Sequence, residues 1–298
     1  MRTTIVGLGL IGGSMAIDLR IKGIANHLIG VDDNNAHAQQ AVDLGIVDEV
    51  CTLNEAVKNT DLIILAIPVS AMSKMIAQLL DKIESHITII DTGSTKASIC
   101  KTVQGHKNRQ QFVAAHPIAG TENSGPSAAF SGLFRNKTMI ICERQLSSSH
   151  ALEVANTIFK ALESKTIFME PVDHDKHVAY VSHLSHVSSF LLGQTVMDIE
   201  KDEKNIFDLA GSGFASTVRL AKSSPDMWAP IFEQNTEYLS QALLEYIMHL
   251  QKFHYYLVKK DSKAIHRIMT EANEIRRVLS GIELKDEKNK VVETLIEE

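Results

Sequence analysis

The sequence predicts an α/β protein in which an N-terminal Rossmann-type, doubly wound sheet precedes an all-α C-terminal dimerisation domain. Three observations support this fold class. Short apolar runs alternate with segments of helical period from Thr3 to about Met169, which is typical of a mostly parallel sheet covered by helices. A glycine-rich turn follows the first apolar run. Beyond Pro171 the strand-like runs cease, and apolar residues recur at three- and four-residue spacing, which indicates helices.

The apolar runs of the first half predict strands, and the segments between most of them predict helices. The expected helices include Ile11–Lys22 and Ser70–Ile83. The expected strands are Thr4–Gly7, Leu28–Asp32, Leu62–Ile67, Thr88–Asp91, Gln111–Ala115, Met139–Cys142 and Thr166–Met169.

The second half is expected to consist of helices. Val172–Glu200 contains no proline and is expected to form one long helix. Further helices are expected at Met227–Lys259 and Ser262–Ser280, after breaks at the Gly211-Ser212-Gly213 turn and at Pro225. Long amphipathic helices need a partner face, so we expect a homodimer formed through these helices. The charge-rich tail Lys285–Glu298 is expected to be partly frayed.

The length of the chain predicts two domains. A chain of 298 residues is longer than a single hydrophobic core usually supports. We expect a dinucleotide-binding domain over residues 1–170 and a helical substrate and dimerisation domain over residues 171–298.

The composition is that of an ordinary globular protein, with 44% apolar and 22% charged residues. A net charge of −6 without a basic block argues against nucleic acid as a partner. No apolar run is long enough to span a bilayer, and no signal peptide is evident. Cys51, Cys100 and Cys142 are far apart and form no CxxC pair, so we expect a cytoplasmic protein without disulfides or structural zinc.

The first strand leads into a dinucleotide-binding motif. The run is Gly7-Leu8-Gly9-Leu10-Ile11-Gly12, in which the glycines allow a tight turn, a close approach of the backbone to pyrophosphate, and helix–strand packing. Asp32 closes the second strand, where a carboxylate accepts hydrogen bonds from ribose hydroxyls and repels a 2′-phosphate. Neither lysine nor arginine follows it at residues 33–36, so the expected cofactor is NAD rather than NADP.

A histidine is expected beside this cofactor. His116 follows the expected strand Gln111–Ala115, and the carboxyl ends of strands in such a domain face the bound nucleotide. Its pKa suits proton transfer near neutral pH. Three further polar segments accompany it along the chain: residues 91–96, residues 174–186 and residues 211–228.

Taken in order, the glycine motif, Asp32 and these segments resemble the prephenate dehydrogenase family of tyrosine biosynthesis, which includes arogenate dehydrogenases. The resemblance covers the chain to about Asn235. It implies a Rossmann domain joined to a helical dimerisation domain. It also implies oxidation of prephenate with NAD or NADP, coupled to loss of carbon dioxide, to give 4-hydroxyphenylpyruvate.

The resemblance implies roles for two catalytic residues. His116 is similar to the family's general base, which accepts a hydrogen bond from the ring hydroxyl of the substrate. Ser94 is similar to the serine that hydrogen-bonds both this hydroxyl and the histidine.

The resemblance also implies substrate contacts. Arg219 is similar to the arginine that binds a substrate carboxylate, for which a guanidinium fork is suited. His186 and Ser182 resemble a substrate-side polar pair. Thr121 and Glu122 match the loop after the histidine and are expected at the mouth of the site.

Structural interpretations apply to the neighbouring residues. His177 and His183 are expected to be structural, because a histidine on a helix is usually held by hydrogen bonds, although His183 lies on a neighbouring stripe and could also serve the substrate. The HxxH spacings lack a nearby cysteine or a third clear ligand, so no metal site is expected. Asp175 and Lys176 are expected to begin a helix in solvent, where they could form an ion pair at the entrance of the site. Trp228 is expected to serve packing in the core or the dimer.

Three alternative functions remain open. Arogenate, whose side chain carries an amine in place of the ketone, could be the preferred substrate. A β-hydroxyacid-type dehydrogenase is disfavoured, because such enzymes rely on a lysine where this chain offers Ser182, His183 and His186. A non-catalytic NAD-binding regulator would bind the cofactor without oxidising any cyclohexadienyl substrate.

Overall fold

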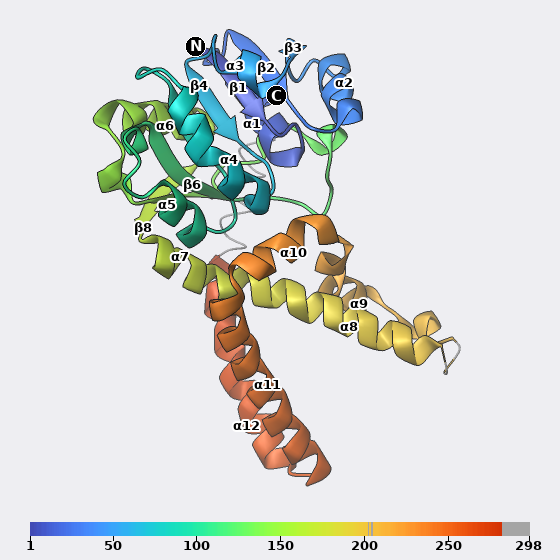
Figure 1. The fold of residues 1–298 in the computed structure, drawn as a ribbon. Helices are drawn as coiled ribbons and strands as arrows, with labels where there is room; N and C mark the ends of the chain where they lie inside the picture. Colours follow the sequence, from blue (N-terminus) through green and yellow to red (C-terminus); the bar gives the residue numbers. More distant parts are fainter. Residues whose placement is uncertain (202, 204, 282–298) are drawn as a thin grey trace. The chain divides into compact units, whose positions relative to one another are not determined.

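The computed structural model describes residues 1–201, 203 and 205–281, which form an eight-stranded sheet and the helices around and after it (Figure 1). The tail Lys285–Glu298 lies outside the described residues. The strands are β1 (Arg2–Val6), β2 (His27–Val31), β3 (Glu49–Val50), β4 (Leu62–Leu65), β5 (Thr88–Asp91), β6 (Phe112–Ile118), β7 (Thr138–Cys142) and β8 (Lys165–Met169).

The strand order is β3-β2-β1-β4-β5-β6-β7-β8. The first six strands are parallel, and their order is that of dinucleotide-binding sheets. β7 runs antiparallel to β6, and β8 runs parallel to β7. The expected mostly parallel, doubly wound sheet is confirmed. The carboxyl ends of β1, β2, β5 and β6 therefore lie along one edge of the sheet.

The strand that carries His116 is longer than the sequence predicts. β6 continues through His116 to Ile118, and His116 lies opposite Ile140 of β7. The expected end at Ala115 was wrong, as was the placement of His116 beyond the strand. Pro117 lacks an N–H and interrupts a strand pattern in the sequence, but the antiparallel neighbour continues the register.

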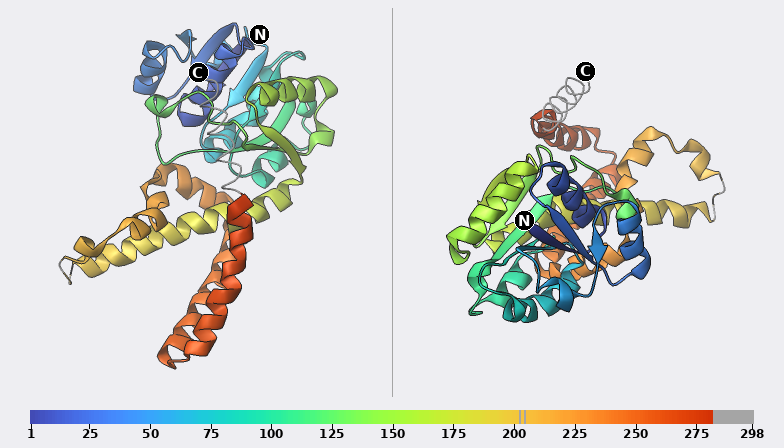
Figure 2. Two further views of the ribbon diagram at one scale, coloured as in Figure 1. Left: turned by 180° about the vertical axis from the view of Figure 1, so that it is seen from behind. Right: turned by 90° about the horizontal axis from the view of Figure 1, so that it is seen from above.

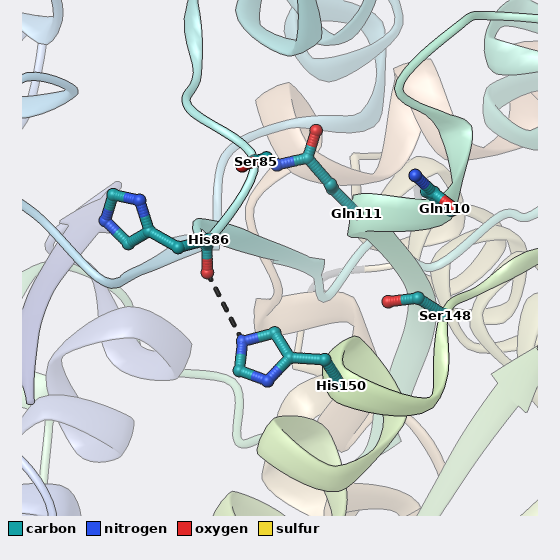
Figure 3. Close-up of a pocket in the computed structure, with 6 residues that line it drawn as sticks. All are labelled: Ser85, His86, Gln110, Gln111, Ser148 and His150. Carbon is teal, nitrogen blue, oxygen red and sulfur yellow. Dashed lines mark hydrogen bonds between the residues drawn. The ribbon is translucent and has the colours of Figure 1, made fainter.

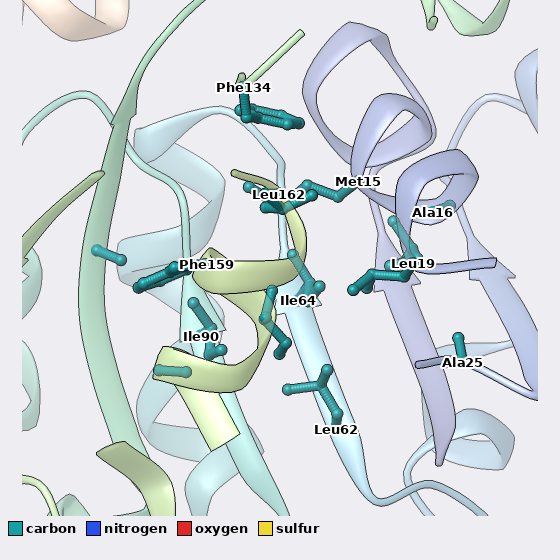
Figure 4. Packing of buried hydrophobic residues seen from close by; sticks show 14 of the residues in the cluster. Met15, Ala16, Leu19, Ala25, Leu62, Ile64, Ile90, Phe134, Phe159 and Leu162 are labelled. Carbon is teal, nitrogen blue, oxygen red and sulfur yellow. The ribbon is translucent and has the colours of Figure 1, made fainter. Parts of the chain in front are cut away.

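Helices cover both faces of the sheet (Figures 1 and 2). Two clusters of buried apolar side chains fill the space between the sheet and these helices. Side chains alternate across each strand, so Ile64 joins one cluster and Ile63 the other. The first cluster contains Met15 and Leu19 of α1 (Leu10–Ile21) and Phe159 of α6 (Ser149–Ala161), and Figure 4 shows their packing. The second cluster contains side chains of α3 (Leu53–Ala56), α4 (Val69–Lys82) and α5 (Ala97–Val103).

Polar side chains fix where two of the helices begin. Asn34 caps α2 (Asn35–Asp43) by accepting hydrogen bonds from the N–H groups of Ala36 and His37. Ser148 caps α6 by accepting from the N–H of Ala151. Such caps satisfy N–H groups that have no partner within the helix.

The expected long helix after Pro171 is helical throughout but not uniform. It consists of α7 (Pro171–Val178), a π-helical turn η4 (Ala179–His183) and α8 (Leu184–Glu200). The expected helix at Met227–Lys259 is two helices, α10 (Pro225–Gln234) and α11 (Thr236–Val258), because the chain breaks at Asn235. Between α8 and α10 lies the short helix α9 (Ser212–Thr217), which Gly211 precedes as expected.

The chain divides into two compact units, residues 1–239 and residues 240–298. The first contains the sheet and α7 to α10. In the second, the remainder of α11 and α12 (Ser262–Ala272) lie side by side (Figures 1 and 2). Within the described part of the chain, no helix is long and apolar enough to cross a membrane.

The backbone packs so closely around Gly12, near the start of α1, that no side chain fits at this position. A Cβ at this position would lie 2.0 Å from the carbonyl oxygen of Gly7 and 2.9 Å from Cγ2 of Ile5. A Cβ at Gly9, the N-cap of the same helix, would meet no atom within 4 Å. The two glycines therefore serve different purposes: Gly12 permits packing, and Gly9 leaves open space.

We predict that Gly12→Ala lowers the free energy of unfolding by at least about 2 kcal/mol, because the clash is with backbone that cannot move aside. Gly9→Ala is the matched control and should change stability by less than about 1 kcal/mol. Urea unfolding of both variants measures the difference. Equal stability losses would contradict the packing role of Gly12.

Candidate active site

The glycine-rich loop lies at the carboxyl end of β1 and is held by Asp32. The Asp32 carboxylate accepts hydrogen bonds from the N–H of Leu8 (2.9 Å) and from the N–H of Asn34 (2.9 Å). Gly7 has a φ of 94°, and its N–H donates to the carbonyl of Val31. The loop is thus fixed between the ends of β1 and β2.

The loop fits a dinucleotide through its backbone rather than its side chains. Leu8 is fully buried and Leu10 is nearly so, whereas Ile11 is half-buried. The space above Gly9 is open, and the first turn of α1 contains no acidic residue. Free N–H groups at such a helix start suit the phosphates of a nucleotide.

A buried ion pair positions the backbone next to His116. Asp91 ends β5, and its carboxylate accepts a hydrogen bond from the N–H of Ala115 (2.9 Å). The ammonium of Lys96 contacts Asp91 and donates to the carbonyl of Ala115 (2.7 Å). Both side chains are fully buried. Together they hold both backbone groups of the residue that precedes His116.

A chain of hydrogen bonds connects His116 to α7. Nδ1 of His116 lies 2.8 Å from Nε2 of His174, and Nδ1 of His174 lies 2.7 Å from Oδ1 of Asp175. Asp175 is 2% exposed, so the expectation of a solvated helix start was wrong. Its carboxylate accepts hydrogen bonds from the N–H groups of Lys96 (2.7 Å) and Ala97 (2.9 Å), at the start of α5.

Burial keeps these histidines neutral. Desolvation lowers the pKa of His116 well below its usual value, and the nearby His174 and Lys96 act in the same direction. Burial also lowers the pKa of His174, although the hydrogen bond to Asp175 raises it in part. Both imidazoles therefore retain a lone pair at neutral pH and can accept a hydrogen bond.

Asn235 connects the same cluster to α10. Its side-chain amide donates to the backbone carbonyl of Asp175 (2.7 Å) and to Nδ1 of His183 (3.1 Å). His183 is 1% exposed, and burial lowers its pKa to about 4. These contacts are those expected of a structural histidine.

His186 lies on α8 beside an aromatic ring. Its Nδ1–H donates to the carbonyl of Ser182 (3.0 Å), and its ring stacks on Trp228 with centroids 3.6 Å apart. Trp228 is nearly buried and packs with Val69, at the start of α4. Ser182 and His186 are joined by this hydrogen bond, and Trp228 stacks on His186 in addition to its expected packing role.

Arg219 lies beside the loop that follows β6. A guanidinium nitrogen lies 3.3 Å from Oε2 of Glu122, and the Arg219 side chain is 52% exposed. A hydrogen bond from its own backbone, together with Arg219, lowers the pKa of Glu122. Thr121 is exposed, and its hydroxyl accepts a hydrogen bond from the N–H of Asn123 (3.2 Å).

Ser94 follows β5 and is half-buried. Among the described residues, no hydrogen bond joins Ser94 to His116, whose Nδ1 is bonded to His174. The neighbouring Thr95 hydroxyl donates to Oε1 of Gln234 on α10 (2.7 Å). The segment after β5 therefore contacts the helical part through Thr95.

The sequence assigned no individual site role to His174, Lys96 or Asn235, and it placed Asp175 only in an ion pair at the entrance of the site. The available signals were the polar segments around residues 91–96 and 174–177, but nothing in the sequence shows that these segments meet. Across the residues with described placement, no group of three or more His, Cys, Asp or Glu side chains could hold a metal ion.

A separate open hollow of about 400 Å³ lies near the amino ends of β5 and β6, and Figure 3 shows the residues that line it. Its lining residues precede β5 and β6 or lie at the start of α6, and Nε2 of His150 lies 3.3 Å from the carbonyl oxygen of His86. Because these residues lie at the amino ends of the strands, we do not assign the hollow to the nucleotide or to His116.

Comparison with known proteins finds two family models on this chain. "Prephenate dehydrogenase, nucleotide-binding domain" matches residues 15–168, and "Prephenate dehydrogenase, dimerization domain" matches residues 170–271. Among curated relatives, the prephenate dehydrogenase of Bacillus subtilis is 32% identical over 286 residues, which cover 93% of this chain and 76% of that protein. The cyclohexadienyl dehydrogenase of Zymomonas mobilis is 29% identical and covers 92% of this chain and 94% of that protein.

Solved structures of prephenate and arogenate dehydrogenases are also similar to this chain. A prephenate dehydrogenase from Aquifex aeolicus, in complex with hydroxyphenyl propionate and NAD+, has a TM-score of 0.85 at 29% identity and covers 94% of this chain and 98% of that chain. The arogenate dehydrogenase of Synechocystis has a TM-score of 0.71 at 26% identity and covers 94% of this chain and 100% of that chain.

We predict that His183 makes the fold sensitive to acid. The unfolded histidine takes up a proton near pH 6.5, but the folded one does so only near pH 4, so the unfolded state binds more protons in that interval. Stability is therefore lost as the pH falls from about 6.5 to 4, by about 3 kcal/mol from this residue.

His183→Gln should reduce this acid-induced loss, measured by urea unfolding at a series of pH values. The exposed His177, replaced by Gln, is the control and should leave the pH dependence unchanged. An unaltered pH dependence in His183→Gln would show that His183 does not titrate in this way.

Proposed function

Because the chain belongs to the prephenate dehydrogenase family, we propose that it catalyses the NAD-dependent oxidative decarboxylation of prephenate to 4-hydroxyphenylpyruvate in tyrosine biosynthesis. The chain is an NAD-dependent oxidoreductase. The observation that carries the proposal is a neutral histidine, His116, at the same edge of the sheet as the glycine-rich loop.

The proposed chemistry needs one proton acceptor and one hydride acceptor. Bound NAD would supply the hydride acceptor for the ring carbon that bears the hydroxyl, and the bonding pair left by the departing carbon dioxide would enter the ring, which becomes aromatic. His116 accepts the hydrogen bond and then the proton of that hydroxyl, which a neutral imidazole can do and an imidazolium cannot. Ser94, on the neighbouring segment after β5, is proposed to orient the hydroxyl.

Asp32 supports NAD rather than NADP. Its carboxylate is fixed by the N–H groups of Leu8 and Asn34, so its negative charge stays where the ribose of the nucleotide lies in such folds. A 2′-phosphate would meet this charge without a lysine or arginine among residues 33–36 to balance it.

The substrate carboxylates are proposed to bind on the helical side. Arg219 offers a half-exposed guanidinium, and its ion pair with Glu122 lies at the surface, where water and salt screen it. A substrate carboxylate can therefore compete for it. His186 and Ser182 are proposed to contact the substrate as well, with Thr121 at the mouth of the site.

We further propose a cytoplasmic homodimer whose domain boundary falls between residues 170 and 171. The family model on residues 170–271 is that of a dimerization domain. The helices α11 and α12 carry exposed apolar side chains that a partner could cover: Leu244, Met248, Leu250, Leu257, Val258 and Met269.

Turnover by the purified protein tests the proposal. Prephenate and NAD should give NADH and 4-hydroxyphenylpyruvate, and kcat/KM should be lower when arogenate replaces prephenate or NADP replaces NAD. A higher kcat/KM with arogenate would make this an arogenate dehydrogenase. No turnover of either substrate with either cofactor would contradict the proposal.

We predict that His116→Asn lowers kcat by a factor of roughly 10² to 10⁴, the usual contribution of general acid–base catalysis. The KM for prephenate should change little, because the carboxylates are bound elsewhere. Steady-state kinetics at saturating NAD measure both constants. A large increase in KM with unchanged kcat would assign His116 to binding instead.

We predict the opposite pattern for Arg219→Gln. The KM for prephenate should rise, because a charge-assisted contact to a carboxylate is lost, while the Kd for NAD is retained. Lys222→Gln, a charge change in the same short segment as Arg219, is the matched control. An unchanged KM in Arg219→Gln would remove this residue from the substrate site.

A further inference from the structure

We propose that His174 and Asp175 are positioning residues that hold His116 in the tautomer with a proton on Nδ1 and a free lone pair on Nε2. The use of that lone pair as a proton acceptor rests on the proposed function. The tautomer itself follows from the hydrogen-bond chain, which can be tested without substrate.

Asp175 determines where the proton of His174 lies. A carboxylate can only accept hydrogen bonds, and Oδ1 of Asp175 lies 2.7 Å from Nδ1 of His174. Nδ1 of His174 must therefore carry a proton. The carboxylate is itself fixed by the N–H groups of Lys96 and Ala97, so it cannot turn away from the histidine.

Nε2 of His174 carries a lone pair rather than a proton. The ring is fully buried, and burial together with the ammonium of Lys96 disfavours a second proton on it. A neutral imidazole with a proton on Nδ1 has a lone pair on Nε2. His174 therefore presents an acceptor to its neighbour.

His116 completes the chain. Its Nδ1 lies 2.8 Å from Nε2 of His174, and this contact is a hydrogen bond only if Nδ1 of His116 donates. The neutral ring of His116 then has its lone pair on Nε2, the nitrogen that takes no part in this series of hydrogen bonds. The two rings meet edge to face, with centroids 5.0 Å apart, so the contact also fixes the orientation of His116.

The arrangement is similar to a catalytic triad that lacks the nucleophile. The carboxylate of Asp175 orients His174, and His174 determines which nitrogen of His116 carries the proton. A purely structural role would instead require only that the buried groups fill space and satisfy each other. The two roles differ in what happens to the tautomer of His116 when His174 is replaced.

Nuclear magnetic resonance of the full chain labelled with ¹⁵N-histidine, without substrate, reads the tautomer directly. The wild-type protein should show His116 protonated on Nδ1. His174→Gln, whose side-chain oxygen can accept from Nδ1, should retain this tautomer in a folded protein. His174→Phe, which offers no acceptor, should shift His116 toward the Nε2-protonated form.

Kinetics provide a second readout. His174→Phe should lower kcat by about 10- to 100-fold, part of the roughly 10² to 10⁴ that a general base supplies, with little change in the KM for prephenate or NAD. His174→Gln should recover most of this loss. His177→Phe, the same change at an exposed position of α7, is the control and should leave kcat unchanged.

Either of two results would overturn the proposal. One is a wild-type His116 protonated on Nε2, and the other is a folded His174→Phe variant with an unchanged tautomer. If His174→Phe does not fold, the wild-type spectrum and His174→Gln still decide. Failure of the protein to turn over prephenate would contradict the proposed function while leaving the tautomer measurement valid.

Discussion

The geometry of the candidate site depends on the hydrogen bonds that the buried carboxylate of Asp175 accepts. The donors are two backbone N–H groups at the start of α5 and the ring N–H of His174. The first two contacts attach α7 to the segment after β5, and the third extends to His116. A charge removed from water is tolerated only when its hydrogen bonds are satisfied, so the positions of α5, α7 and β6 are set together.

A second buried charge acts on the same histidine from the sheet side. Lys96 and Asp91 hold the backbone of Ala115, and the ammonium adds to the burial that lowers the pKa of His116. The ion pair thus has a geometric and an electrostatic consequence. The strand presents His116 in one position, and the surrounding charge keeps it neutral.

The sequence predicted those features that depend on residues close together in the chain. The alternation of apolar runs predicted the sheet, and the glycine spacing predicted the loop that Asp32 holds. It failed where distant segments meet. The strand β6 continues through Pro117 because β7 pairs with it, and the helix after Pro171 contains a π-turn at residues 179–183. Asp175 resembles a solvated helix start in sequence and is buried in the structure.

Local periodicity and motif spacing were enough to predict the fold class and the nucleotide loop. How His116 is held depends on segments that are far apart in the chain. His174 is 58 residues from His116, and Asp175 is 79 residues from Lys96. Contacts over such separations arise from the packing of α7 against the carboxyl edge of the sheet, which no local pattern in one sequence records.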